Sequence, residues 1–151
     1  MNKKRVIFFI MMIGMMMLIF FFSSQNGEES SAMSSGVFLR LKENFNVNID
    51  IGVIRKLAHL TEYLFLGVSA ILYVGTFKNS DEKSMAIATA ICVLYAVSDE
   101  FHQYFIANRD GRFGDVLIDS IGAMIGITIT MLILLIIRMK NDKKITIWHL
   151  N

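Results

Sequence analysis

The sequence predicts an all-α fold, a bundle of four transmembrane helices with a short extracytoplasmic amphipathic segment. Of its 151 residues, 54% are hydrophobic and 19% are charged, which is too apolar for an ordinary soluble domain. Four apolar runs of roughly 17 to 22 residues are each long enough to cross ~30 Å of hydrocarbon as a helix. The chain has no proline, and we expect a single membrane domain over residues 1–151.

The first apolar run covers residues 6–22 and follows Lys3, Lys4 and Arg5. A basic start before an apolar core also suits a cleaved signal peptide, but no small-residue cleavage site follows Phe22. We therefore expect a retained membrane helix.

A polar segment over residues 23–50 separates this helix from the next apolar run. Its first part, residues 23–31, is rich in Ser, Asn and Gly and predicts a loop. Four apolar residues then recur at helical spacing, Val37, Phe38, Leu41 and Phe45. This pattern is typical both of a short amphipathic helix on the membrane surface and of a segment packed against the bundle, and it does not choose between them.

The remaining runs cover residues 57–77, 85–105 and 116–137. The connection over residues 78–84 is short and polar, so the helices that it joins should be antiparallel neighbours. Residues 106–115 include Asn108, Gly111 and Gly114 and should turn the chain again.

Lysine and arginine residues are distributed unevenly between the two ends of the predicted helices. One end holds nine of them, and the other holds six over far longer segments. The nine are Lys3, Lys4, Arg5, Lys78, Lys83, Arg138, Lys140, Lys143 and Lys144, and the six are Arg40, Lys42, Arg55, Lys56, Arg109 and Arg112. Because basic residues favour the cytoplasmic side, we expect a multi-pass protein with both termini in the cytoplasm.

Three polar clusters lie near the same end of the predicted helices, where we expect the outer leaflet. They are Arg55-Lys56-x-x-His59-x-x-Glu62-Tyr63, Ser98-Asp99-Glu100-x-His102-Gln103, and Arg109 with Asp115-x-x-x-Asp119. Ionisable side chains are costly in a membrane and usually have a function there. Gly122 and Gly126 follow Asp119 at the spacing that lets membrane helices approach closely, which should draw Asp119 toward the neighbouring helices.

Three interpretations of these clusters stay open. In the first, His59, Glu62, Asp99, His102 and Asp119 bind a divalent metal such as Zn²⁺ or Mn²⁺ and are catalytic residues for a lipid-linked substrate. In the second, Arg55, Lys56, Glu100, Gln103, Arg109 and Asp115 bind the polar headgroup of a membrane lipid or lipid-linked envelope precursor, and the arginines hold phosphate. Arg112 fits the same ring but is expected to be a solvated rim residue. In the third, the clusters are a structural charge clamp.

These motifs, in this order, resemble the VanZ-like family of bacterial membrane proteins. The resemblance rests on Phe22-Ser23-Ser24-Gln25, on the three clusters above, and on Gly67, Gly122 and Gly126. It implies a role in the envelope of a Gram-positive-like bacterium, in its cytoplasmic membrane, and an effect on susceptibility to the glycopeptide teicoplanin. The family usually has Pro-Gly before the loop arginine, whereas Ala107-Asn108 precede Arg109 here. Because asparagine tolerates the left-handed backbone conformation, we expect the turn to be kept.

Other function classes lack their sequence signals. Cys92 is the single cysteine, so it can form neither an intrachain disulfide nor a cysteine-based zinc site, and we expect it to be a packing residue. No basic patch with interleaved aromatic residues indicates nucleic-acid binding. No Gly-x-Ser-x-Gly, phosphate-binding glycine loop or zincin motif is present, and whether the protein is an enzyme stays open.

Overall fold

Five helices make up the part of the chain that the computed structural model describes, which is residues 3–45, 50–109 and 111–148. They are α1 (Lys3–Ser23), α2 (Gly27–Phe45), α3 (Ile51–Val74), α4 (Asp81–Gln103) and α5 (Phe113–Trp148). Four of them are long and apolar enough to cross a membrane: α1, α3, α4 and the Phe113–Asn141 part of α5. The described residues contain no strand, and the predicted all-α fold with four membrane helices is confirmed.

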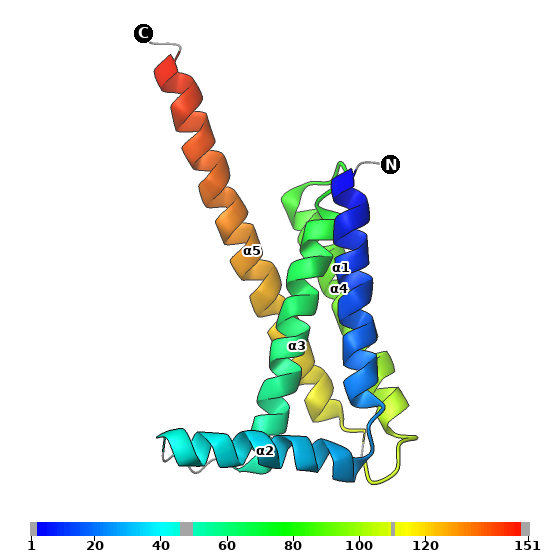
Figure 1. Cartoon of the computed structure of the whole chain (residues 1–151). Coiled ribbons are helices and arrows are strands. Elements are labelled where there is room, and N and C mark those ends of the chain that lie inside the picture. The colour runs from blue at the N-terminus through cyan, green and yellow to red at the C-terminus, as the bar shows by residue number, and fades with distance from the viewer. Residues whose placement is uncertain (1–2, 46–49, 110, 149–151) are drawn as a thin grey trace.

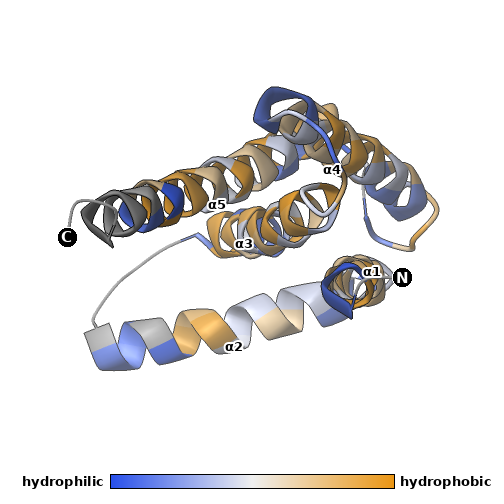
Figure 2. Cartoon of the chain, turned by 90° about the horizontal axis from the view of Figure 1, so that it is seen from above, coloured by the Kyte–Doolittle hydropathy of each residue, from blue (hydrophilic) through white to orange (hydrophobic). Residues whose placement is uncertain are grey.

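The helices form a bundle, and α2 runs along one side of it at the level of one end (Figures 1 and 2). Helices α1, α3 and α4 run beside one another, and α5 crosses α3 and then leaves the bundle toward its C-terminus. Helix α2 lies across the bundle at a steep angle to the others (Figures 1 and 2). We call the end at which α2 lies the site end, and the end with the N-terminus and the α3–α4 connection the opposite end.

Most helices begin earlier than their apolar runs, because their starts include polar residues that a hydropathy window excludes. Helix α3 starts at Ile51 rather than near residue 57, and the Asp50 side chain caps it by accepting a hydrogen bond from the Gly52 N–H at 2.7 Å. Helix α4 starts at Asp81 after Ser80, whose hydroxyl accepts from the Lys83 N–H at 3.3 Å. Such caps satisfy backbone donors that a helix start leaves without partners. Hydropathy alone therefore misplaced these boundaries.

The loop predicted for residues 23–31 is wrong from Gly27 onward, since α2 begins there. The cause is a pair of reciprocal hydrogen bonds that cap the helix start, which the Ser-, Asn- and Gly-rich composition of this segment did not predict. The Asn26 side chain accepts from the Glu29 N–H at 2.9 Å, and the Glu29 carboxylate accepts from the Asn26 N–H at 3.2 Å. This exchange is the arrangement of a capping box. The helix is therefore longer than the amphipathic segment that we predicted.

Helix α2 packs against the bundle mainly through small polar residues. Ser30 and Ser34 are buried, whereas Val37 and Leu39 are exposed. The side chains of Leu41 and Phe45, on which the amphipathic prediction also rested, lie outside the described part of the chain. The first half of α2 therefore contacts the bundle, and exposed apolar residues remain on the described part of its second half.

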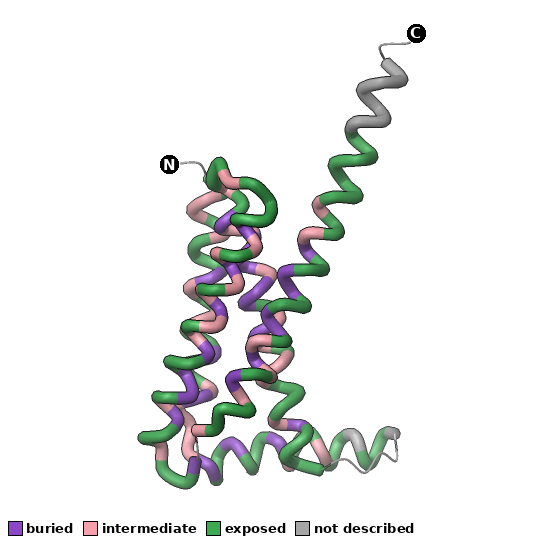
Figure 3. The backbone as a smooth tube through the Cα atoms, turned by 180° about the vertical axis from the view of Figure 1, so that it is seen from behind, coloured by how far each residue is buried: buried purple, intermediate pink, exposed green. Residues whose placement is uncertain are grey.

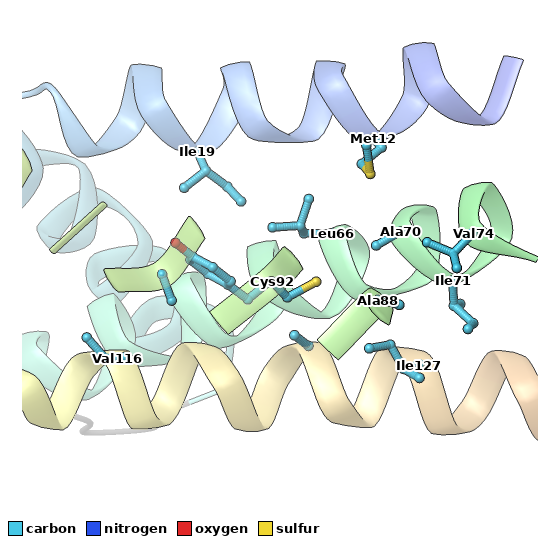
Figure 4. Packing of buried hydrophobic residues seen from close by; sticks show 13 residues of the cluster. Met12, Ile19, Leu66, Ala70, Ile71, Val74, Ala88, Cys92, Val116 and Ile127 are labelled. Atoms are coloured by element: carbon cyan, nitrogen blue, oxygen red, sulfur yellow. The ribbon is translucent and has the colours of Figure 1, made fainter. Parts of the chain in front are cut away.

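Helix α3 is the centre of the hydrophobic core. Leu66, Ala70, Ile71 and Val74 of α3 contact Met12 and Ile19 of α1, Ala88 and Cys92 of α4, and Ile127 of α5 (Figure 4). Buried positions gather where these helices meet, whereas residues 131–141 of α5 are mostly exposed (Figure 3). Cys92 is a fully buried free thiol, as expected for a packing residue.

Helices α3 and α5 meet backbone to backbone. A Cβ atom added at Gly67, Gly122 or Gly126 would lie 2.2, 2.3 or 2.1 Å from a carbonyl oxygen of the opposite helix. No side chain larger than a hydrogen atom fits at such positions without moving the helices apart. The close approach predicted from the Gly-x-x-x-Gly pair is confirmed, and it brings the preceding turn of α5, with Asp119, next to α3.

The opposite end is held by contacts at its surface. The Arg5 guanidinium donates to the hydroxyl and the carbonyl oxygen of Thr76 at 3.2 and 3.0 Å. Arg138 forms an ion pair with Asp81 at 2.7 Å. The start of α1, the α3–α4 connection and the Arg138 region of α5 therefore lie together, as the alternating direction of four membrane helices requires.

Candidate functional site

The site end brings the three predicted polar clusters together. Helix α3 contributes Arg55, His59 and Glu62, helix α4 contributes Asp99, Glu100 and Gln103, helix α5 contributes Asp115 and Asp119, and the α4–α5 loop contributes Arg109. Asp99, Glu100, Gln103, Arg109 and Asp119 are all buried. Helical spacing explains the convergence, because residues three or four apart share a helix face.

Gln103 is the centre of the hydrogen-bond network. Its amide nitrogen donates to the Asp99 carboxylate at 3.2 Å and to the Glu100 carboxylate at 3.3 Å. Its amide oxygen accepts from the Arg109 guanidinium at 3.1 Å and from the Arg55 guanidinium at 3.4 Å. One neutral side chain therefore links two carboxylates with two arginines.

Arg109 extends into the site from the turn at Asn108. Asn108 has a positive φ of 57°, so the expectation that asparagine keeps the left-handed turn is confirmed. The guanidinium of Arg109 also donates to the Phe22 carbonyl oxygen at 3.1 Å, which ties the loop to the end of α1. Burial and, second, the neighbouring Arg55 charge lower the pKa of Arg109 below its ordinary value, as desolvation does for any cation.

Ser23 is a site residue to which sequence reasoning gave no role. Its side chain is fully buried, and its hydroxyl donates to the Asp99 carboxylate at 3.0 Å. The Gln103 amide also donates to the Ser23 oxygen at 3.4 Å. The Ser-Ser-Gln motif after the first apolar run was the available signal, but sequence spacing does not show which helix such a motif faces.

Among the described residues, His59, Asp99 and Asp119 form a group that could bind a metal ion. One donor atom from each lies within 4.8 Å of the other two. The His59 Nδ1 atom is 3.8 Å from Asp119 Oδ1. Asp119 is fully buried, and neither of its carboxylate oxygens has a hydrogen-bond partner among the described residues. His59 Nδ1 and Glu62 Oε2 are likewise buried without a partner there.

A cavity of about 250 Å³ opens beside this group, and we call it the basic cavity. Its lining includes four cationic side chains, those of Arg55, Lys56, Arg109 and Arg112, with His59, Asp115 and Asp119. A second cavity of about 220 Å³ lies between α2 and α3, and we call it the α2 cavity. Its lining is largely apolar and includes Phe22, Met33, Val37, Ile54 and Glu62. Arg55, His59 and Arg109 line both cavities.

Two of the predicted site residues have other contacts. His102 faces α1, where its Nε2 atom lies 3.2 Å from the Ser24 hydroxyl and its ring stacks on Phe20 at 4.8 Å. It therefore lies outside the group of His59, Asp99 and Asp119. Glu100 accepts from the Arg112 N–H at 2.8 Å and so orders the α4–α5 loop.

Comparison with known families gives one match that covers most of the chain. Residues 8–136 match the model of the family described as VanZ/LLP1. No curated protein and no solved structure gives a significant match.

Proposed function

Because the chain belongs to the VanZ/LLP1 family of membrane proteins, with four helices long enough to span a bilayer, we propose that it binds the phosphate headgroup of an envelope lipid. The ligand is a phospholipid or a lipid-linked envelope precursor, and it occupies the basic cavity. The observation that carries this proposal is the convergence of Arg55, Lys56, Arg109 and Arg112 on one cavity.

The charges of the basic cavity favour an anion. Four cationic side chains line it, against the two carboxylates of Asp115 and Asp119. Among the described residues, Arg55 and Arg109 have amide or carbonyl oxygens as hydrogen-bond acceptors and form no ion pair. Arginine binds phosphate through two parallel hydrogen bonds, so guanidinium groups without a carboxylate partner are suited to it.

The α2 cavity favours a lipid over a free phosphate. It is mostly apolar and shares Arg55, His59 and Arg109 with the basic cavity. A headgroup held by these arginines therefore has an apolar space next to it, in which part of an acyl or prenyl chain can be buried. Burying apolar chain surface is favourable and roughly proportional to the area removed from water.

The proposed setting is the bacterial cytoplasmic membrane, with both termini in the cytoplasm and the site end in the outer leaflet. The uneven distribution of lysine and arginine supports this orientation. The resemblance to the VanZ-like family implies an effect on a glycopeptide antibiotic. We therefore include an effect on teicoplanin susceptibility in the proposal.

A purely structural charge clamp would explain the same cluster if its charges were paired with one another. Asp119 argues against that alternative. It is fully buried, and its carboxylate has no hydrogen-bond partner among the described residues and only His59, at 3.8 Å, as a possible ionic one. A clamp that leaves its most buried carboxylate without a hydrogen bond stabilises little.

The binding proposal can be tested with the full chain purified in detergent. Native mass spectrometry would compare three probes: phosphatidic acid, diacylglycerol with the same acyl chains, and glycerol 3-phosphate. We expect phosphatidic acid to bind and diacylglycerol not to bind. Arg55→Gln should weaken phosphatidic acid binding about tenfold or more, because a charge-assisted hydrogen bond contributes about 1.5–3 kcal/mol. Arg138→Gln, which removes the same charge at the opposite end, should bind like the wild type.

Each remaining outcome has a definite meaning. Equal binding of diacylglycerol, or unchanged affinity in Arg55→Gln and Lys56→Gln, would overturn the phosphate assignment. If glycerol 3-phosphate binds as tightly as phosphatidic acid, the ligand is a soluble phosphate rather than a lipid. In a susceptible Gram-positive host, the wild type should change teicoplanin tolerance, and Arg55→Gln at equal membrane abundance should not.

A further inference from the structure

The structure assigns a second ligand to the same end of the bundle: we propose that His59, Asp99 and Asp119 bind one divalent transition-metal ion. The ion lies beside the basic cavity, whose lining includes His59 and Asp119. The metal site does not depend on the proposed function. Only a contact between the metal and the lipid phosphate rests on that proposal.

The donor atoms are already near metal-binding distances. They lie within 4.8 Å of one another, whereas two ligands of one Zn²⁺ ion, each about 2.0–2.1 Å from the metal, are at most about 4.2 Å apart. Shifts of under about 1 Å in each side chain would close the difference. The three residues come from α3, α4 and α5, and the backbone contact between α3 and α5 fixes two of them relative to each other.

Asp119 supplies independent support for a cation. Its side chain is fully buried, and both carboxylate oxygens lack a hydrogen-bond partner among the described residues. Within the described part of the chain, its one possible ionic contact is His59 Nδ1 at 3.8 Å, and that nitrogen is itself buried without a hydrogen bond there. Burying such groups without partners is unfavourable. A metal ion between them would satisfy the histidine nitrogen and the carboxylate at once.

Asp99 has the neighbours expected of a metal-ligating carboxylate. Ser23 and Gln103 donate hydrogen bonds to its Oδ2 atom at 3.0 and 3.2 Å. Partners of this kind orient ligating side chains and are a regular part of metal sites. Gln103 is held in turn by Arg109, so the carboxylate is fixed from two sides.

The donor set indicates the class of metal and what else it can bind. One imidazole with two carboxylates suits Zn²⁺ or Mn²⁺ better than Ca²⁺ or Cu⁺. Three protein ligands leave a fourth position open. This position would face the basic cavity, where a phosphate oxygen can take it. Arginines on one side and a metal on the other would then hold the same phosphate.

The test measures metal content directly. The full chain, purified without chelators, would be stripped with EDTA, reloaded with Zn²⁺ or Mn²⁺ alone, desalted and analysed by mass spectrometry of the metal. We expect one ion per chain in the wild type. Asp119→Asn and His59→Gln should retain less than a tenth of it. Asp81→Asn, a carboxylate removed at the opposite end, should retain it fully, and so should His102→Gln.

A second measurement covers variants that fail to fold. The folded state of each variant would be checked by size-exclusion chromatography and circular dichroism, and a rise in the unfolding temperature of the wild type on adding Zn²⁺ or Mn²⁺ needs no variant. A folded wild type that takes up no stoichiometric metal overturns the site. Metal retained by folded Asp119→Asn, or lost from folded His102→Gln, overturns the ligand assignment.

Failure of the two proposals can be told apart. Phosphatidic acid binding would be measured before and after EDTA treatment. Lipid binding without any metal uptake refutes the metal site and leaves the lipid proposal intact. Metal uptake without lipid binding refutes the lipid proposal and leaves the metal site intact. A drop in lipid affinity on EDTA treatment that added Zn²⁺ or Mn²⁺ reverses supports both.

Discussion

The two ends of the bundle contain the same kinds of charged side chains in opposite surroundings. At the opposite end, Arg138 and Asp81 pair at 2.7 Å with side chains 56% and 52% exposed. At the site end, Asp99, Arg109 and Asp119 are 4%, 7% and 0% exposed. The Asp119 carboxylate has no hydrogen bond to any residue of the described chain. The ion pair at the opposite end therefore lies in solvent, whereas these three charged side chains at the site end are withdrawn from it.

This contrast teaches where to look for function in a small membrane protein. Exposed ion pairs contribute little to stability and are easily replaced. Buried charges without full pairing are unfavourable, particularly within a membrane, and they persist where they have a task. The burial of charge, more than the number of charges, distinguishes the candidate site from the rest of the chain.

The largest expected difference between the two ends is their side of the membrane. In a Cys92→Ala background, Arg40→Cys on α2 should react with an impermeant thiol reagent in intact cells. Glu82→Cys, at the start of α4, should react only after the cells are opened. Both positions are exposed, so access to the reagent decides the result. The reverse labelling pattern would place the site end in the cytoplasm and remove the outer-leaflet proposal.

The next effect concerns the packing that holds the site end together. Gly126→Leu should lower the free energy of unfolding by about 3 kcal/mol, because the new side chain cannot fit against a main-chain oxygen. Thr128→Leu, at an exposed position two residues along α5, is the matched control and should change little. Thermal unfolding in detergent would compare the two. Equal stability of both variants would mean that the α3–α5 contact is looser than described.

A smaller effect should separate the arginines of the two ends. Arg109→Gln should destabilise the protein by about 2 kcal/mol, because it weakens hydrogen bonds from a charged, buried group to Gln103 and Phe22. Arg138→Gln should leave the unfolding temperature unchanged within error, since its ion pair is exposed. The same unfolding measurement would compare them. A loss as large for Arg138→Gln would contradict the contrast between the two ends.

The fold could be predicted from the sequence because long apolar runs are a local feature of the chain. Four apolar runs, separated by short polar connections, determine four membrane helices with little help from tertiary contacts. The helix boundaries could not be predicted in this way, because the N-caps Asp50 and Ser80 let α3 and α4 begin before their apolar runs. Helix α2 was underestimated for the same reason, because the cap between Asn26 and Glu29 precedes a segment rich in serine.

The convergence of the three polar clusters could be predicted from the sequence, and their contacts less so. The depth of each cluster along its apolar run correctly placed the polar residues of α3, α4 and α5 at one end. The Gly-x-x-x-Gly pair correctly predicted that Asp119 lies near α3. The direction of His102 toward α1 did not follow, because a residue on α4 can face either of two neighbouring helices. The role of Ser23 was missed for the same reason: its partner Asp99 is 76 positions away in sequence.

The glycine contact between α3 and α5 also determines how the site can vary. Gly122 lies against Leu60, next to His59, and three residues beyond Asp119. The spacing between His59 and Asp119 is thus set by touching main chains rather than by adjustable side chains. Asp99 belongs to a third helix, α4, which is linked to α3 at this end by the hydrogen bond from Arg55 to Gln103. Among relatives with different ligands, the two residues should keep their separation, and specificity should change through α4 and the loop that follows it.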